Sequence, residues 1–187
     1  MAKVVKRSGN EVTVEVRIWL DGTLLEMEGA NQEATNEVGC CAMREALGRF
    51  DADGGPLRVG DTKLSARERN PKEYHPPYGP VQVERYIHQR SHGRRVYCPP
   101  EHGARIVRGA TPLLASQISH KYAQLNVRSV QTDLQQNHGR KVATSYIQNV
   151  AQWGQATSLR PKKRTGSTRC QRWAVPSPLS WLASTGP

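Results

Sequence analysis

Apolar residues recur at helical spacing between Thr111 and Trp153, and this stretch predicts three short helices. The first has a favourable N-cap in Thr111 and a proline at the first helical position, where a missing N–H is harmless. Its apolar stripe, spaced by four, four and three residues, consists of Leu114, Ile118, Tyr122 and Leu125. The second is capped by Asn126 and stopped by Gly139, and between them it carries Val127, Val130 and Leu134. The third carries Val142, Ile147 and Val150, with Tyr146 and Trp153 alongside.

The order helix, glycine turn, helix is the layout of the helix-turn-helix motif, whose second helix enters the major groove of DNA. The buried and turn positions of that motif are filled here by Leu134, Gly139, Val142, Ile147 and Val150. The match requires two extra turn residues, Arg140 and Lys141, and Gln135 stands where a small alanine is usual. The alternative is a three-helix packing unit that binds no ligand.

The N-terminal part of the chain predicts a strand, a turn and a helix. Apolar and polar residues alternate strictly over Glu11–Leu20, which is typical of a half-buried strand. The pair Asp21-Gly22 then predicts a hairpin into Thr23–Met27. A helix is predicted over Asn31–Phe50, because one face can collect Ala34, Val38, Cys41, Ala42, Ala46 and Phe50.

The middle of the chain predicts further strands on either side of a proline-rich boundary. Leu57–Val59 and Thr62–Leu64 read as short strands, and Pro71–Pro80, with its four prolines, reads as a loop. A clear alternating strand follows over residues 81–88, and Arg94–Cys98 is its predicted hairpin partner. Two interpretations are open for the arginines near this hairpin, a phosphate-contacting surface or a solvated hairpin rim; they are Arg85, Arg90, Arg94 and Arg95.

These elements predict an α+β architecture in three parts. Residues 1–108 form an N-terminal region of strands with one helix and a β-hairpin, and residues 109–153 form the three-helix, helix-turn-helix-like unit. Residues 154–187 are rich in Ser, Thr, Pro and Gly without periodicity, which predicts a disordered tail.

The charge of the chain changes this picture only slightly. A net charge of +11 suggests a polyanionic partner such as nucleic acid. However, the last 34 residues carry six basic and no acidic side chains, which leaves +5 over residues 1–153. With 36% hydrophobic residues and a mean hydropathy of −0.68, the chain has no run that could span a membrane and no apolar signal core, so the cytoplasm is expected.

Four cysteines and several histidines raise the question of a metal site. Cys98 and His102 are spaced C-x3-H, and His88 and His92 are spaced H-x3-H, so the four could bind zinc tetrahedrally. The simpler interpretation is that these are polar residues of a hairpin, and no metal or cofactor is expected.

Six stretches of the chain resemble the N-terminal part of bacterial insertion-sequence transposases of the ISKra type. They lie within Val12–Trp153 and are NEVG at Asn36–Gly39, RFD-x-DG-x-PL at Arg49–Leu57, YGPVQVERYIHQRS at Tyr78–Ser91, YCPPEHGARIVRGATP at Tyr97–Pro112, ISHKYA at Ile118–Ala123 and NHGRKVATSYIQNVAQW at Asn137–Trp153. The resemblance implies recognition of the double-stranded ends of a mobile element.

The sequence departs from this family after Trp153. There the family continues into an acidic helical stretch and a catalytic domain, whereas this chain has a basic tail. With suitable synonymous codons, the neighbouring frame of Thr157–Trp173 can encode such an acidic stretch. We therefore expect that a frameshift near Gly154 produced an out-of-frame tail and removed the catalytic domain, so that the chain is not an enzyme.

The DNA contacts are expected on the turn and on the outward side of the third helix, where short donors and acceptors can reach base edges or phosphates. The residues expected there are Arg140, Lys141, Thr144, Ser145, Gln148 and Asn149, with Arg128, Lys121 and His138 as additional backbone contacts. Two alternatives stand beside DNA binding: a regulatory fragment that binds full-length transposase or itself, and a zinc-dependent nucleic-acid module.

Overall fold

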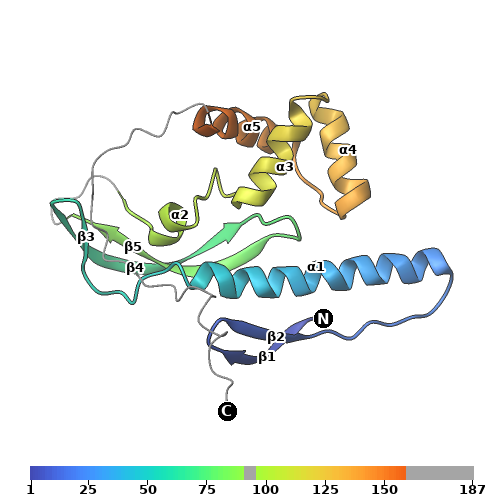
Figure 1. Ribbon diagram of the computed structural model, residues 1–187, viewed down its shortest axis with the longest axis horizontal. Helices are drawn as coiled ribbons and strands as arrows, with labels where there is room; N and C mark the ends of the chain where they lie inside the picture. Colours follow the sequence, from blue (N-terminus) through green and yellow to red (C-terminus); the bar gives the residue numbers. More distant parts are fainter. Residues whose placement is uncertain (91–95, 159–187) are drawn as a thin grey trace, which may run out of the picture.

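The computed structural model describes residues 1–90 and 96–158 of the chain. In this part it is a mixed α+β protein with two small sheets and five helices. Figure 1 shows them in layers: a β-hairpin, the long helix α1, a three-stranded sheet, and helices α3, α4 and α5 on the far side of that sheet. The elements are β1 (Lys3–Ser8), β2 (Glu11–Glu15), α1 (Leu24–Gly48), β3 (Leu57–Val59), β4 (Thr62–Tyr74), β5 (Val81–Gln89), α2 (Pro99–Gly103), α3 (Pro112–Tyr122), α4 (Val127–His138) and α5 (Thr144–Ser158).

The N-terminal hairpin differs from the one that the sequence predicted. β1 pairs antiparallel with β2 through a turn at Gly9, whose φ is 56°. β2 ends at Glu15 instead of Leu20, and no hairpin forms at Asp21-Gly22. Instead, Thr23 caps α1 in a capping box: its hydroxyl accepts from the Glu26 N–H at 3.4 Å, and the Glu26 carboxylate accepts from the Thr23 N–H at 2.7 Å.

The helix predicted over Asn31–Phe50 exists but begins at Leu24 and ends at Gly48. Of its predicted apolar face, Ala34 and Cys41 are buried, while Ala42 and Phe50 are exposed. The helix also buries Leu47, which packs in one cluster with the sheet residues Tyr74, Val81 and Val83.

The second sheet has the order β3-β4-β5. β5 confirms the strand predicted at residues 81–88, but its partner is β4, with a register from Ser65↔Gln89 to Tyr74↔Val81. Residues 71–74, predicted as loop, therefore belong to a strand. Pro71 is tolerated because this part of β4 pairs with β5 alone, so no second strand needs its missing N–H. The predicted hairpin partner contributes one bridge, His88↔Tyr97, and Arg94 and Arg95 lie outside the described residues.

The three C-terminal helices form where the sequence predicted them. Asn126 caps α4 through the Ser129 N–H at 3.0 Å, and Gly139 ends it in the left-handed conformation. Thr111 occupies the N-cap of α3, although its side chain makes no capping hydrogen bond. Two details were wrong: Leu125 is 45% exposed because it follows the end of α3, and α5 continues to Ser158 through the first residues of the predicted tail. Residues 159–187 of that tail lie outside the described part.

These helices share one core. It contains Ala110, Leu114, Ala115, Ile118, Val130, Leu134, Val142, Ile147, Val150 and Ala151. Burial of so many apolar side chains is the main favourable term that holds three short helices together, since helices of this length are marginal in water alone.

Among the described residues, hydrogen bonds join the helical unit to the rest of the molecule at two places. The His75 N–H donates to the Gly109 carbonyl at 2.8 Å, and the Thr111 N–H donates to the His75 carbonyl at 3.0 Å. Farther along, the Asn36 side chain on α1 donates to the His138 carbonyl at 3.3 Å. The end of α4 is thereby fixed against the middle of α1. Over the described residues, none of the helices combines the length and apolar character needed to cross a bilayer.

Candidate nucleic-acid interface

Helix α5 is fixed from its inner side by apolar side chains. Ile147, Val150 and Ala151 are fully buried, and they pack against Leu134 of α4 and Leu114 of α3 in the shared core. Their spacing of three and one residues places them on one side of the helix. The outer side of α5 is consequently left to its polar residues.

The turn before α5 is built by the end of α4. Gly139 has φ 62° and ψ 21°, and its N–H donates to the Gln135 carbonyl at 3.1 Å. This bond, together with the left-handed conformation, is the αL ending of a helix. The next N–H, of Arg140, reaches back to the Leu134 carbonyl at 2.9 Å, so two backbone hydrogen bonds close the end of α4. Gln131 then holds the far side of the turn, because its side-chain amide donates to the Val142 carbonyl at 2.8 Å. The sequence reasoning missed Gln131, and only the tertiary fold reveals its role.

The outer side of α5 carries four of the residues predicted to contact DNA. Ser145, Gln148 and Asn149 are exposed, and Thr144 at the helix start is half-buried. Lys141 in the turn is exposed as well. The amides of Gln148 and Asn149 each offer a donor and an acceptor, which is the pattern that pairs with the major-groove edge of adenine.

Arg140 corrects the prediction, because it does not face solvent. Its side chain is 6% exposed and lies in the interface with α1 and the loop before β5. Its Nη1 is 3.7 Å from the position that a Cβ on Gly79 would occupy. Burial lowers the pKa of Arg140, and the nearby Cys40 and Tyr146 partly oppose this shift. Among the described residues it forms no ion pair with a carboxylate. Arg140 therefore packs the helical unit against α1 and is not placed to contact DNA.

The three residues predicted to contact the DNA backbone lie in different surroundings. Arg128 is exposed on α4. Lys121 is half-buried and forms an ion pair with Asp133, which joins the end of α3 to α4. His138 is half-buried at the end of α4, where its carbonyl accepts from Asn36. Arg128 is the one whose charge is fully presented to solvent.

One cation near α5 escaped the sequence reasoning. Arg108 lies over the indole ring of Trp153, with its guanidinium carbon 4.2 Å from the ring centroid. A cation–π contact of this kind holds Arg108 at the surface against Trp153 of α5. Because 45 residues separate the two positions, no local sequence signal could have paired them.

The predicted zinc ligands have other partners in the described part of the chain. The Arg85 guanidinium donates to Cys98 Sγ, His88 Nε2 lies 3.2 Å from the Gly55 carbonyl, and the His102 ring stacks on Tyr97 at 4.6 Å. Within residues 1–90 and 96–158, no three metal-binding side chains gather at one place. His92, the fourth predicted ligand, lies outside that range.

The predicted phosphate-contacting hairpin is likewise divided. Arg85 is 9% exposed and lies 3.5 Å from the Glu101 carboxylate, so its charge faces inward. Arg90, which follows the end of β5, donates to the Thr62 hydroxyl at the start of β4. These two arginines therefore do not form a common surface.

Comparison of the chain with protein-family models, with curated proteins and with solved structures finds no match.

Proposed function

We propose that the chain binds double-stranded DNA through the outer side of α5, with Lys141 and Arg128 contacting the phosphate backbone on either side. The observation that carries the proposal is the division of α5 into two sides. Ile147, Val150 and Ala151 anchor one side, and Ser145, Gln148 and Asn149 are exposed on the other. A helix fixed in this way can enter a major groove without unfolding or losing its core.

The charge distribution of the helical unit supports a polyanionic partner. Residues 112–158 contain one acidic residue, Asp133, and its carboxylate is engaged by Lys121. α5 itself carries no acidic residue, so no carboxylate on it would repel phosphate. The exposed cations Lys141 and Arg128 lie in the turn and at the start of α4, where backbone contacts would set the orientation of α5.

The target class follows from the resemblance described above. The stretch Asn137–Trp153, which resembles ISKra-type transposases, contains the turn and the first ten of the fifteen residues of α5. We therefore propose that the DNA bound is the end of an insertion element. The residues assigned to this task recognise DNA, and no cutting or joining step is assigned to them.

Fluorescence anisotropy with labelled duplexes tests this proposal. The probes are 30-bp duplexes from the two ends of the DNA element that encodes the chain, and a scrambled duplex of the same base composition. Wild-type protein is expected to prefer the end duplexes at 150 mM salt. The double variant Gln148→Ala/Asn149→Ala is expected to lose at least tenfold of that preference, because each good bidentate base contact contributes about 1–3 kcal/mol of discrimination.

The matched control is Asn31→Ala/Gln32→Ala, which removes the same two side-chain types from the exposed part of α1. It should bind as wild type does. The proposal is wrong if wild-type protein binds end and scrambled duplexes equally, or if both double variants behave alike.

A second candidate, association with a protein partner, is favoured by the start of α1. Trp19, Leu24 and Leu25 are 84%, 72% and 77% exposed, and an apolar group of this kind often marks a protein contact. Full-length transposase or a second copy of the chain would be the partner. Sedimentation velocity over a hundredfold concentration range tests self-association, which Leu24→Ser/Leu25→Ser should abolish. A concentration-independent monomer would exclude a second copy.

A further inference from the structure

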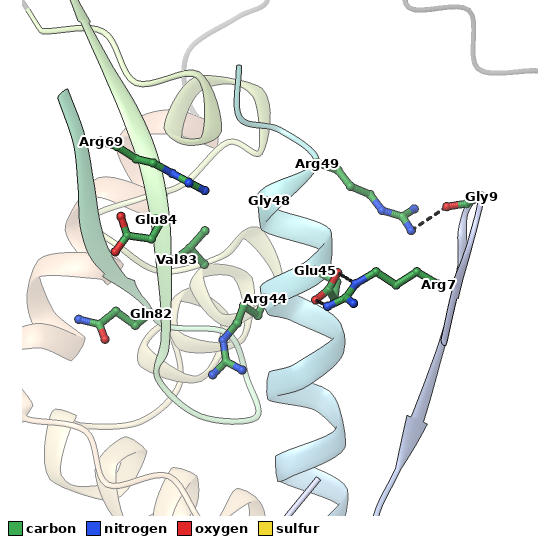
Figure 2. Close-up of a pocket in the computed structure, with 10 residues that line it drawn as sticks. All are labelled: Arg7, Gly9, Arg44, Glu45, Gly48, Arg49, Arg69, Gln82, Val83 and Glu84. Atoms are coloured by element: carbon green, nitrogen blue, oxygen red, sulfur yellow. Dashed lines mark hydrogen bonds and ion pairs between the residues drawn. The ribbon is translucent and has the colours of Figure 1, made fainter. Parts of the chain in front are cut away.

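A cavity of about 500 Å³ lies between α1, the β1–β2 hairpin and the three-stranded sheet. Figure 2 shows arginines on both of its sides: Arg44 and Arg49 come from α1, Arg7 from β1 and Arg69 from β4. Two glutamates, Glu45 and Glu84, also line it, so the lining side chains carry a net charge of +2. In Figure 1, α1 and β1–β2 lie on the opposite side of the sheet from α5. The cavity is therefore separate from the proposed DNA-reading helix.

The arginines differ in whether their charge is already neutralised. Arg7 holds Glu45 with two hydrogen bonds of 2.7 and 2.6 Å, which occupies both groups. Within the described part of the chain, Arg49 bonds only neutral oxygens, namely the carbonyls of Gly9 and Asn10 and the Asn10 side chain. It is thereby held in place while its charge stays uncompensated.

Arg44 and Arg69 are also without a carboxylate among the described residues. Arg69 rests over the ring of Tyr86 at 5.6 Å, which orients its guanidinium without neutralising it. Both side chains are exposed and can reach a ligand from solvent. Three cations thus face one cavity with their charge available.

The positive charge around the cavity acts on Glu45. The hydrogen bond from Arg7 lowers the pKa of Glu45, and the charges of Arg7, Arg49 and Arg44 act in the same direction. Glu84 opposes them as the only carboxylate of the lining that is not held by Arg7. Three uncompensated arginines against one such glutamate leave an excess of positive charge.

We propose that this arginine cavity binds the phosphodiester backbone of a nucleic-acid duplex, independently of α5. Guanidinium groups match phosphate oxygens with two parallel hydrogen bonds, and arginines from two different walls can contact successive phosphates. The chain would then hold duplex DNA on two opposite faces, reading bases with α5 and gripping backbone with the cavity. Binding in the cavity would be insensitive to sequence and strongly weakened by salt.

The salt dependence of duplex binding tests the inference. The probe is a labelled 30-bp duplex of mixed sequence, titrated at 50–200 mM KCl. Arg44→Gln/Arg69→Gln is expected to make the slope of log K against log salt shallower by about 1.8, because each phosphate contact contributes about 0.9. The control Arg17→Gln/Arg58→Gln removes the same charge from exposed positions outside the cavity and should keep the wild-type slope.

Further variants and a competitor keep each outcome decisive. Since Arg69 rests on Tyr86, Arg44→Gln alone is measured as well, with an expected change of about 0.9. Equal slopes for the cavity and control variants would overturn the inference. So would displacement of the duplex by poly-L-glutamate at equal charge concentration, because the cavity would then select charge and not phosphate. The neutral variant Gln148→Ala/Asn149→Ala should keep the slope, so failure of α5 and failure of the cavity are distinguishable.

Discussion

Gly139 shows how one backbone conformation decides where α5 can lie. Its φ of 62° is the left-handed region, and an added Cβ would stand 3.4 Å from the Asn36 side-chain nitrogen. We expect Gly139→Ala to lower the free energy of unfolding by about 1–2 kcal/mol. Urea denaturation followed by circular dichroism measures the change.

The matched control for this substitution is Gly29→Ala. Gly29 lies in the exposed first half of α1, where an added Cβ meets nothing within 4 Å. Alanine should there stabilise the protein by about 0.5–1 kcal/mol. Equal effects of the two substitutions would contradict the role given to Gly139.

The neighbouring cations Arg140 and Lys141 should behave differently in DNA binding. Arg140 is buried and Lys141 is exposed. Arg140→Met, which keeps a long apolar chain in the interface, is expected to leave the salt slope unchanged. Lys141→Met should make it shallower by about 0.9, corresponding to one lost phosphate contact. If Arg140→Met changed the salt slope and Lys141→Met did not, the phosphate contact would be made by Arg140 and the prediction would be wrong.

Gly139 and Arg140 show what the sequence can and cannot predict about single residues. The role of Gly139 could be predicted because a glycine directly after a stretch of helical apolar periodicity indicates the end of that helix. The burial of Arg140 could not, because it depends on Cys40 and Gly79, which lie 100 and 61 residues away in the chain. The sequence alone does not show which of two adjacent polar residues is buried, because burial depends on distant parts of the chain.

At the scale of elements, α5 should tolerate changes on one side only. Ile147 is fully buried in the helical core, and the next residue, Gln148, is exposed. Ile147→Ala is expected to cost about 2–5 kcal/mol of unfolding free energy, whereas Gln148→Ala should stay within about 0.5 kcal/mol. Thermal and urea unfolding of the two variants measure the difference. A comparable loss of stability in both variants would contradict the assignment of Ile147 to the buried side of α5 and Gln148 to the exposed side.

The ion pair between α3 and α4 gives the helical unit a pH dependence. The hydrogen bond from Lys121 lowers the pKa of Asp133, so this carboxylate stabilises the fold above its ordinary pKa of 3.8. The contribution, about 0.2–1 kcal/mol for a partly exposed pair, is lost as pH falls through the lower pKa of the folded state. A double-mutant cycle with Lys121→Met and Asp133→Asn should show this coupling at pH 7 and a smaller coupling at pH 2. Equal coupling at both values would contradict it.

Helices with local signals were predictable, and strands that depend on distant partners were not. The caps Asn126 and Gly139 define α4 within its own sequence. By contrast, β4 has little apolar alternation and contains Pro71, and it is a strand because β5 pairs with it. The start of α1 was missed for another reason. The pair Asp21-Gly22 predicted a hairpin, whereas the residues that follow it, Thr23 and Glu26, form the capping box of α1.

At the scale of the whole molecule, α1 connects the two faces proposed to bind DNA. Asn36 on α1 holds the end of α4, and Arg44 and Arg49 on the same helix line the arginine cavity. A duplex on α5 and a duplex backbone in the cavity would therefore be held at a fixed separation by one long helix. The sequence predicted the first face from periodicity, but the second brings together β1, α1, β4 and β5, which no local pattern relates.

Nuclear magnetic resonance of the labelled chain, titrated with an element-end duplex, shows directly whether α5 holds the DNA. The backbone amides of residues 144–152 and the side-chain amides of Gln148 and Asn149 should shift strongly. The amides of Asn31 and Gln32 on α1 should not move. Tight binding of the duplex with unshifted signals along α5 would contradict the account, because the DNA would then be held by another part of the molecule.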